Sequence, residues 1–148
     1  MSSTHLSLHL HVIFGTKGRE PWIAPEWRER LHAYLGGVAR ELGVVPEAVG
    51  GVEDHVHLLL GLRATHATAE VMREIKRASS EWIHGTIGLP AFAWQDGYGA
   101  FTVSASLCPE VKAYIARQEE HHQRRSFREE YLDLLRKSGV EFDERYVD

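Results

Sequence analysis

The sequence is poor in several features that each define a class of protein. Cys108 is the only cysteine among 148 residues, so a disulfide within the chain is excluded. No apolar run approaches the roughly 18 to 20 residues of a membrane helix, and the N-terminal stretch lacks the pattern of a signal peptide. The net charge of −4 gives no general attraction to nucleic acid. We therefore expect a soluble, cytoplasmic protein in which any nucleic-acid contact comes from a local patch.

The overall composition is that of a folded globular protein. Hydrophobic residues make up 43% and charged residues 26% of the chain, values that argue against disorder. We expect one domain over residues 1–148, with an acidic C-terminal tail from about residue 139. Histidine is the compositional oddity, because the 10 histidines cluster in a few short stretches. Those stretches are candidates for chemical function.

Hydrophobic periodicity predicts an α+β chain. The strand pattern of period two and the helical pattern of period 3.6 alternate along the sequence, with Gly43, Gly85 and the pair Gly50-Gly51 as stops or turns. This order predicts a ferredoxin-like (RRM-like) antiparallel sheet backed by helices, with additional C-terminal helices. The expected strands are 5–14, a short strand after 43, 55–60 and a strand near 101–105; the expected helices are 25–42, 67–85, one from Pro109 to about 125, and one from Ser126.

Two histidines one residue apart precede a run of leucines in "EDHVHLLLGL". Residues two apart in a strand project from one face, so His55 and His57 can aim their rings at a shared metal ion. The solvent side of an ordinary strand can carry the same pattern, and His9 and His11 repeat the spacing in the first strand. The motif alone therefore leaves the metal hypothesis open.

The helix after Pro109 carries a second polar pattern. Tyr114, Gln118 and His121 are spaced by four and seven residues, which places them near one face of a helix. A tyrosine at a helix–sheet boundary with its hydroxyl in water fits equally well. Tyr98, between two glycines in a loop, is an alternative functional tyrosine.

Basic residues form candidate local patches for a phosphate backbone. Arg73, Lys76 and Arg77 are spaced at i, i+3 and i+4 on the second helix, a stripe that either tracks phosphates or is simply solvated. The candidate DNA-binding residues are Lys17, Arg19, Arg73, Lys76, Arg77, Arg124 and Arg125.

The combined motifs resemble a known family. "DHVHLLL", "TKGREPW" after the first strand, and "VKAYIARQ" are similar to the insertion-sequence-200-like HUH transposases with a single tyrosine, including their REP-associated relatives, over roughly residues 5–137. The resemblance implies that His55, His57 and Gln118 bind a divalent metal, with His121 as a substitute ligand, and that Tyr114 is the nucleophile, with Tyr98 second. Imidazole ligands alone favour manganese, nickel or zinc, whereas the resemblance implies Mg²⁺ or Mn²⁺.

The resemblance also implies an activity and partners. It implies a homodimer that cleaves and rejoins single-stranded, hairpin-forming DNA through a 5′-phosphotyrosine bond. That bond would conserve the energy of the phosphodiester, so a free 3′-hydroxyl could reverse the step. Two alternatives stay open: a non-catalytic module that binds single-stranded nucleic acid, and a metal-dependent phosphodiesterase with no covalent intermediate. The C-terminal third is acidic, so long-range electrostatic attraction to DNA should be weak. This leaves room for a domesticated role in place of an active mobile element.

Overall fold

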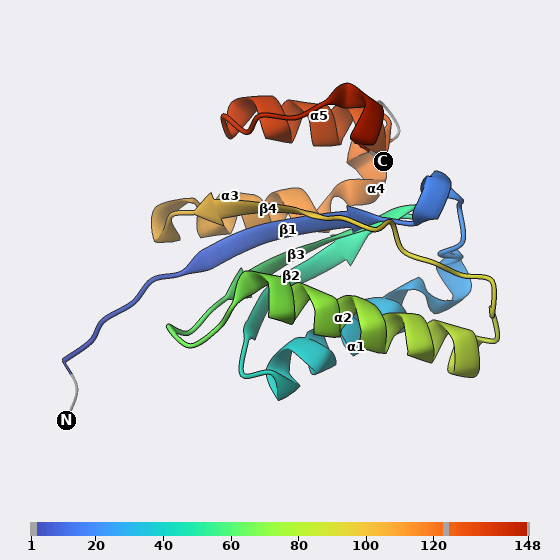
Figure 1. Cartoon of the computed structure of the whole chain (residues 1–148), viewed down its shortest axis with the longest axis horizontal. Helices are drawn as coiled ribbons and strands as arrows, with labels where there is room; N and C mark the ends of the chain where they lie inside the picture. Colours follow the sequence, from blue (N-terminus) through green and yellow to red (C-terminus); the bar gives the residue numbers. More distant parts are fainter. Residues whose placement is uncertain (1–2, 123–124, 148) are drawn as a thin grey trace.

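A four-stranded antiparallel sheet separates two groups of helices in the computed structural model, which describes residues 3–122 and 125–147 (Figure 1). Helices α1 and α2 cover one face, and α3, α4 and α5 lie on the other. Within the described residues, no helix is long and apolar enough to cross a membrane. The elements are β1 His9–Gly15, η1 Lys17–Arg19, α1 Pro25–Glu41, β2 Val45–Gly51, β3 His55–Gly61, α2 Thr68–Trp82, η2 Ile83–Ile87, β4 Gly99–Val103, η3 Ala105–Leu107, α3 Cys108–Ala116, α4 Gln118–His121, α5 Phe127–Lys137 and η4 Glu144–Tyr146.

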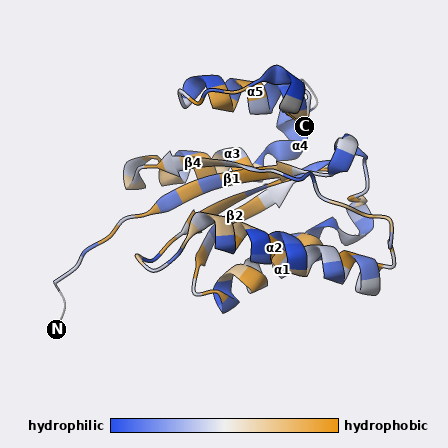
Figure 2. Ribbon diagram, in the orientation of Figure 1, coloured by the Kyte–Doolittle hydropathy of each residue, from blue (hydrophilic) through white to orange (hydrophobic). Residues whose placement is uncertain are grey.

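The strand order β2-β3-β1-β4 confirms the predicted ferredoxin-like sheet. The central strands β1 and β3 pair antiparallel, with His11 opposite Leu59 and Ile13 opposite His57. Hydrophilic and hydrophobic segments alternate along the first part of β1 (Figure 2). Because side chains alternate between faces, Val12 and Phe14 enter the core under α1 and α2. The histidines of both central strands therefore project toward α3, α4 and α5.

The helix ends agree with the sequence only in part. Gly43 adopts a positive φ of 78° directly after α1, as expected of the residue that ends a helix. Helix α2 is followed by a wider turn, η2, and the positive-φ glycine is Gly88 rather than the predicted Gly85. Ser126 caps α5 by accepting a hydrogen bond from the Glu129 amide, which confirms the capping box.

The turn that the sequence predicts at the glycine pair before β3 is wrong. Gly50 and Gly51 instead end strand β2, paired with His57 and Val56. A Cβ on Gly50 would lie 2.5 Å from the carbonyl oxygen of Ile115, so the glycine lets α3 approach the sheet closely. This contact sets the distance between the sheet and α3, the helix that carries Tyr114.

In the C-terminal third, the first of the two expected helices, from Pro109 to about residue 125, is interrupted. The helix from Cys108 breaks at Arg117, whose φ of −105° and ψ of 27° leave the helical region, and a short α4 follows. The acidic segment folds back: Val147 is buried with α5 residues, and Arg128 donates hydrogen bonds to the Val147 and Glu144 carbonyl groups. Apolar burial and these carbonyl bonds hold the segment despite its acidity.

Candidate functional site

Strand β3 holds the two histidines in fixed orientations. His55 and His57 are both fully buried and contact Gln118 of α4 and Glu130 of α5, respectively. The Nδ1–H of His55 donates to the Asp54 carboxylate at 2.7 Å, and Nδ1 of His57 shares a proton with Nε2 of His11 at 2.7 Å. Such bonds fix which nitrogen faces a ligand, so both histidines direct Nε2 into the site.

Three side chains from outside β3 surround the point toward which these two Nε2 atoms are directed. Gln118 begins α4, His122 follows it, and Glu130 lies one turn inside α5. The Oε1 atom of Gln118 lies 3.1 Å from His55 Nε2 and 3.0 Å from His122 Nε2. The Oε1 atom of Glu130 lies 3.0 Å from His57 Nε2, 3.1 Å from His122 Nε2 and 3.3 Å from His55 Nε2. Gln118 and Glu130 are each 1% exposed.

This donor set fits a divalent metal. An ion with bonds of about 2.1 Å at right angles separates its ligands by about 3 Å, close to the spacings in this cluster. His55 and His122 already use Nδ1–H on Asp54 and on the Arg125 carbonyl group, so their Nε2 atoms face carboxylate and amide oxygens. A proton can occupy each of these contacts, and a divalent cation can displace those protons. His55, His57, His122 and Glu130 thus form a cluster able to hold a metal ion.

The charges within the cluster oppose one another. Burial works against a charged His55, but hydrogen bonds to Asp54 and Glu130 outweigh it and raise its pKa to about 9. Burial lowers the pKa of His57 to about 3, which keeps its lone pair available. Burial likewise opposes ionisation of Glu130, but hydrogen bonds from the histidines hold its pKa well below the usual range. The cluster therefore presents a carboxylate together with exchangeable protons that a metal can displace.

Tyr114 lies at the edge of this cluster. Its hydroxyl donates a hydrogen bond to Glu130 Oε2 and lies 3.4 Å from His121 Nε2. Burial and the Glu130 charge raise the pKa of Tyr114 well above its ordinary value. The amide of Gln118 donates to Glu130 Oε2 at 3.3 Å. One carboxylate therefore joins the candidate nucleophile to the candidate metal ligands.

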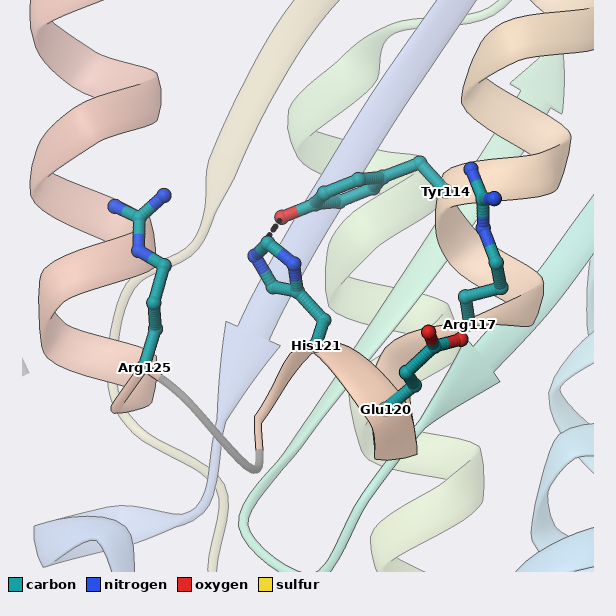
Figure 3. A pocket seen from close by; sticks show the side chains of 5 residues that line it. All are labelled: Tyr114, Arg117, Glu120, His121 and Arg125. Carbon is teal, nitrogen blue, oxygen red and sulfur yellow. Dashed lines mark hydrogen bonds between the residues drawn. The ribbon is translucent and has the colours of Figure 1, made fainter.

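A surface hollow of about 330 Å³ opens beside the tyrosine and is lined by Tyr114, Arg117, Glu120, His121 and Arg125. Figure 3 shows the tyrosine hydroxyl pointing at His121, with Arg117 and Arg125 on opposite sides of that pair. The two guanidinium groups give the hollow the charge that a phosphate oxygen requires. The hollow is therefore an approach to Tyr114 for an anionic chain.

The other histidine and tyrosine candidates either lie elsewhere or contact the residues of the cluster. His11 stands behind His57 as its hydrogen-bond partner, whereas His9 pairs with Glu47 at the other end of β1. Tyr98 packs against the core cluster of the opposite face. His121 reaches the Tyr114 hydroxyl, while its neighbour His122 meets the candidate ligands Gln118 and Glu130.

The predicted basic residues fall into two groups. Arg19 and Arg125 line a hollow beside Asp54 and His122, close to the cluster; Arg124 lies outside the described residues. Lys17 is exposed and lines a different hollow near Tyr98. The α2 stripe lies across the sheet from Tyr114 (Figure 1).

Contacts within the α2 stripe already use its charges. Lys76 Nζ donates to the carbonyl groups of three residues, Gln95 to Gly97, so it holds a loop. Arg77 pairs with Glu74 at 2.8 Å and with Glu81 at 3.0 Å. The structure therefore does not bring the stripe to the candidate site.

Sequence reasoning missed Glu130, His122 and Asp54. A signal for Glu130 was present: it falls three residues after Phe127 and next to Tyr131 on the apolar side of α5, where a carboxylate is out of place. Asp54 and His122 adjoin predicted site residues, but adjacency alone does not show which way a side chain points.

Comparisons with known proteins agree with this fold. The family model described as IS200-like transposase matches residues 4–118. A candidate transposase structure from Deinococcus radiodurans R1 is 26% identical, with a TM-score of 0.65 over 80% of this chain and 95% of that one. A REP-associated tyrosine transposase bound to a REP hairpin is 16% identical, with a TM-score of 0.61 over 82% and 74%. No curated protein matched the sequence.

Proposed function

The chain belongs to the IS200-like transposase family, and from that premise we propose that it is a metal-dependent endonuclease and strand transferase for single-stranded DNA. The observation that carries the proposal is the convergence of His55, His57, Gln118 and Tyr114 around Glu130. These residues come from four separate elements, β3, α3, α4 and α5, and only the fold brings them together. A binding module would not need a buried donor cluster beside a tyrosine hydroxyl.

His55, His57 and Gln118 would hold the ion, Mg²⁺ or Mn²⁺, and we add Glu130 and His122 as candidate ligands. A bound divalent cation supplies positive charge that polarises a phosphate and stabilises charge developing on it. Asp54 and His11 orient the two β3 imidazoles from behind. Arg117 and Arg125 would orient the DNA phosphates in the hollow beside Tyr114.

The chain's own residues suit attack by the tyrosine. The Tyr114 hydroxyl already donates to Glu130, which orients it. The raised pKa of Tyr114 and the lowered pKa of Glu130 keep the proton on the hydroxyl until positive charge at the site lowers the Tyr114 pKa. The phenolate oxygen then bonds to the scissile phosphorus as the bond to the 3′-oxygen breaks, and that oxygen leaves as a 3′-hydroxyl after gaining a proton. The product is a 5′-phosphotyrosine bond, which a second 3′-hydroxyl can attack to rejoin DNA.

The proposed substrate is a DNA hairpin with a single-stranded flank, acted on by a homodimer. Hairpin binding is supported by the likeness in fold to the REP-associated transposase bound to a REP hairpin. Because the chain is acidic overall, binding should depend on the local cations around Tyr114 rather than on long-range steering. Sedimentation would measure the oligomeric state.

The deciding experiment uses labelled single-stranded hairpins with flanks, incubated with protein and Mn²⁺ and separated on a denaturing gel. Wild type is expected to carry label at protein size, while Tyr114→Phe binds the hairpins equally and gives no adduct. Tyr98→Phe is the matched control and should retain the adduct.

The products also separate the alternatives. An adduct that survives in Tyr114→Phe contradicts the assignment of the nucleophile. Free cleaved ends with unlabelled protein would indicate a metal-dependent phosphodiesterase, and hairpin binding that is indifferent to chelators, with no cleavage, would indicate a binding module.

A further inference from the structure

A second cluster of metal-binding side chains lies at the other end of the same sheet face. His9 from β1, Glu47 from β2 and Cys108 from α3 place their ligand atoms within 4.8 Å of one another. We propose that these residues form a separate site for a borderline-soft divalent cation such as Zn²⁺, distinct from the cluster at Tyr114. The inference does not rest on the proposed function.

The sheet is built so that these residues can meet. His9 is opposite Gly61 of β3, and Gly61 is opposite Val45 of β2, so a strand lies between His9 and Glu47. Gly61 has no side chain, and a Cβ there would lie 3.8 Å from the Glu47 carboxylate. An irregularity in β2 between Pro46 and Ala48 frees Glu47 from the ladder. His9 Nδ1 thereby reaches Glu47 Oε2 at 2.6 Å across the strand.

The three donor atoms lie in surroundings typical of metal ligands: they are partly or fully buried, and hydrogen bonds orient their side chains. Ser7 Oγ lies 3.1 Å from His9 Nε2, so a hydrogen bond from Nε2–H fixes the ring and leaves Nδ1 to face Glu47. The side chains of His9 and Glu47 are each 18% exposed, which leaves an entry path for an ion. Cys108 is 6% exposed and is the first residue of α3, where its thiol donates a hydrogen bond to the Ser104 carbonyl oxygen at 3.7 Å.

The ligand types indicate the class of ion. Thiolate, imidazole and carboxylate together suit zinc, which commonly takes three protein ligands and one water. A tetrahedral ion with these ligands separates its donors by about 3.3 to 3.7 Å. The His9–Glu47 pair, now at 2.6 Å, must open slightly, and Cys108, which lies within 4.8 Å of both, must close by no more than about 1.5 Å.

The site would be independent of the cluster at Tyr114. Gly61 lies four residues from His57 along β3, or about 13 Å, and the buried side chain of Leu59 stands between them beside Cys108. Both sites nevertheless act on one helix, because Cys108 begins α3 and Tyr114 lies near its end. A metal at Cys108 would anchor the start of the helix that carries the candidate nucleophile.

The test exploits the single cysteine of the chain. Metal-free protein is titrated with Co²⁺, and the near-ultraviolet absorption that arises from charge transfer between a thiolate and cobalt is followed. Since Cys108 is the only cysteine, this band reports on the proposed site alone. Wild type is expected to develop the band, and Zn²⁺ should displace it. Cys108→Ser should lose it, while His9→Gln and Glu47→Gln should each weaken the cobalt affinity by at least about tenfold.

Two results would overturn the proposal. Cobalt binding to wild type without the thiolate band would restrict binding to the histidine cluster. A band of unchanged affinity in both His9→Gln and Glu47→Gln would mean adventitious binding to the thiol alone. The partly exposed His9 and Glu47 keep the test usable if Cys108→Ser does not fold. His57→Ala, which alters the Tyr114 cluster, should keep the band, so failure of either site is seen separately.

Discussion

Replacing Gly50 by alanine should damage the candidate site without touching any candidate ligand. The added Cβ would lie 2.5 Å from the Ile115 carbonyl oxygen and 2.8 Å from Ile115 Cγ2. The first of these atoms is backbone and cannot rotate away, so α3 must move off β2. Ile115 adjoins Tyr114, and the shift therefore displaces the tyrosine from Glu130.

The expected cost follows from overpacking of a tight contact. Such substitutions destabilise by about 1 to 3 kcal/mol, and each kcal/mol lowers the melting temperature of a domain this size by about 2 to 4 °C. A displacement near 1 Å at the reacting groups reduces a rate by about 100-fold. Thermal unfolding and single-turnover cleavage of a hairpin measure the two effects separately.

Gly37→Ala is the matched control. Gly37 lies inside α1, where a Cβ would meet no atom within 4 Å, so alanine should stabilise the helix by up to about 1 kcal/mol. If Gly50→Ala has the melting temperature and cleavage rate of wild type, the close approach of α3 does not position Tyr114, and this account of the site's geometry is wrong.

Two further predictions concern the ion and the DNA. Because Asp54 and Glu130 raise the pKa of His55 to about 9, a metal that binds below that pH must displace a proton. The Mn²⁺ affinity measured by calorimetry should therefore rise about tenfold from pH 7 to pH 8. An affinity that does not change with pH would contradict this. Glu130→Gln should bind Mn²⁺ more weakly with a shallower pH slope, since the carboxylate that holds the proton is gone. Arg117→Gln and Arg125→Gln should each weaken hairpin binding and lower its salt slope by about one, whereas Arg73→Gln and Arg77→Gln should leave both unchanged in filter-binding titrations.

The fold was predictable because it depends on local periodicity and end signals. The alternation of polar and apolar residues around His11 predicted which side chains of β1 face each side of the sheet, and Ser126 with Glu129 predicted where α5 begins. The break at Arg117 was not predictable, because a run such as "YIARQEEHH" has good helix formers throughout and the break comes from tertiary packing. Gly50 read as a turn because a glycine required by close packing looks identical in sequence to one required by a positive φ.

The candidate site was predictable in its β3 and α3 parts and not in its α5 part. Residues matched by the family model end at 118, so Glu130 lies beyond the matched region. Its place in the cluster depends on how α5 crosses the sheet, which is set by Phe127 and Tyr131 packing on Ile13 and Phe101. Those contacts join residues more than 25 positions apart, and no pattern within α5 specifies them.

The position of Glu130 also determines how a substrate can reach the cluster. The candidate ligands on β3 and at Gln118 are 0 to 1% exposed, and the Glu130 carboxylate fills the space among them. The hollow lined by Arg117 and Arg125 reaches Tyr114 first. A phosphate entering there meets His121 and the hydrogen bond between Tyr114 and Glu130 before it meets the imidazoles of His55 and His57. Binding of the phosphate and release of the tyrosine hydroxyl from Glu130 must therefore occur together, which couples activation of Tyr114 to the presence of DNA.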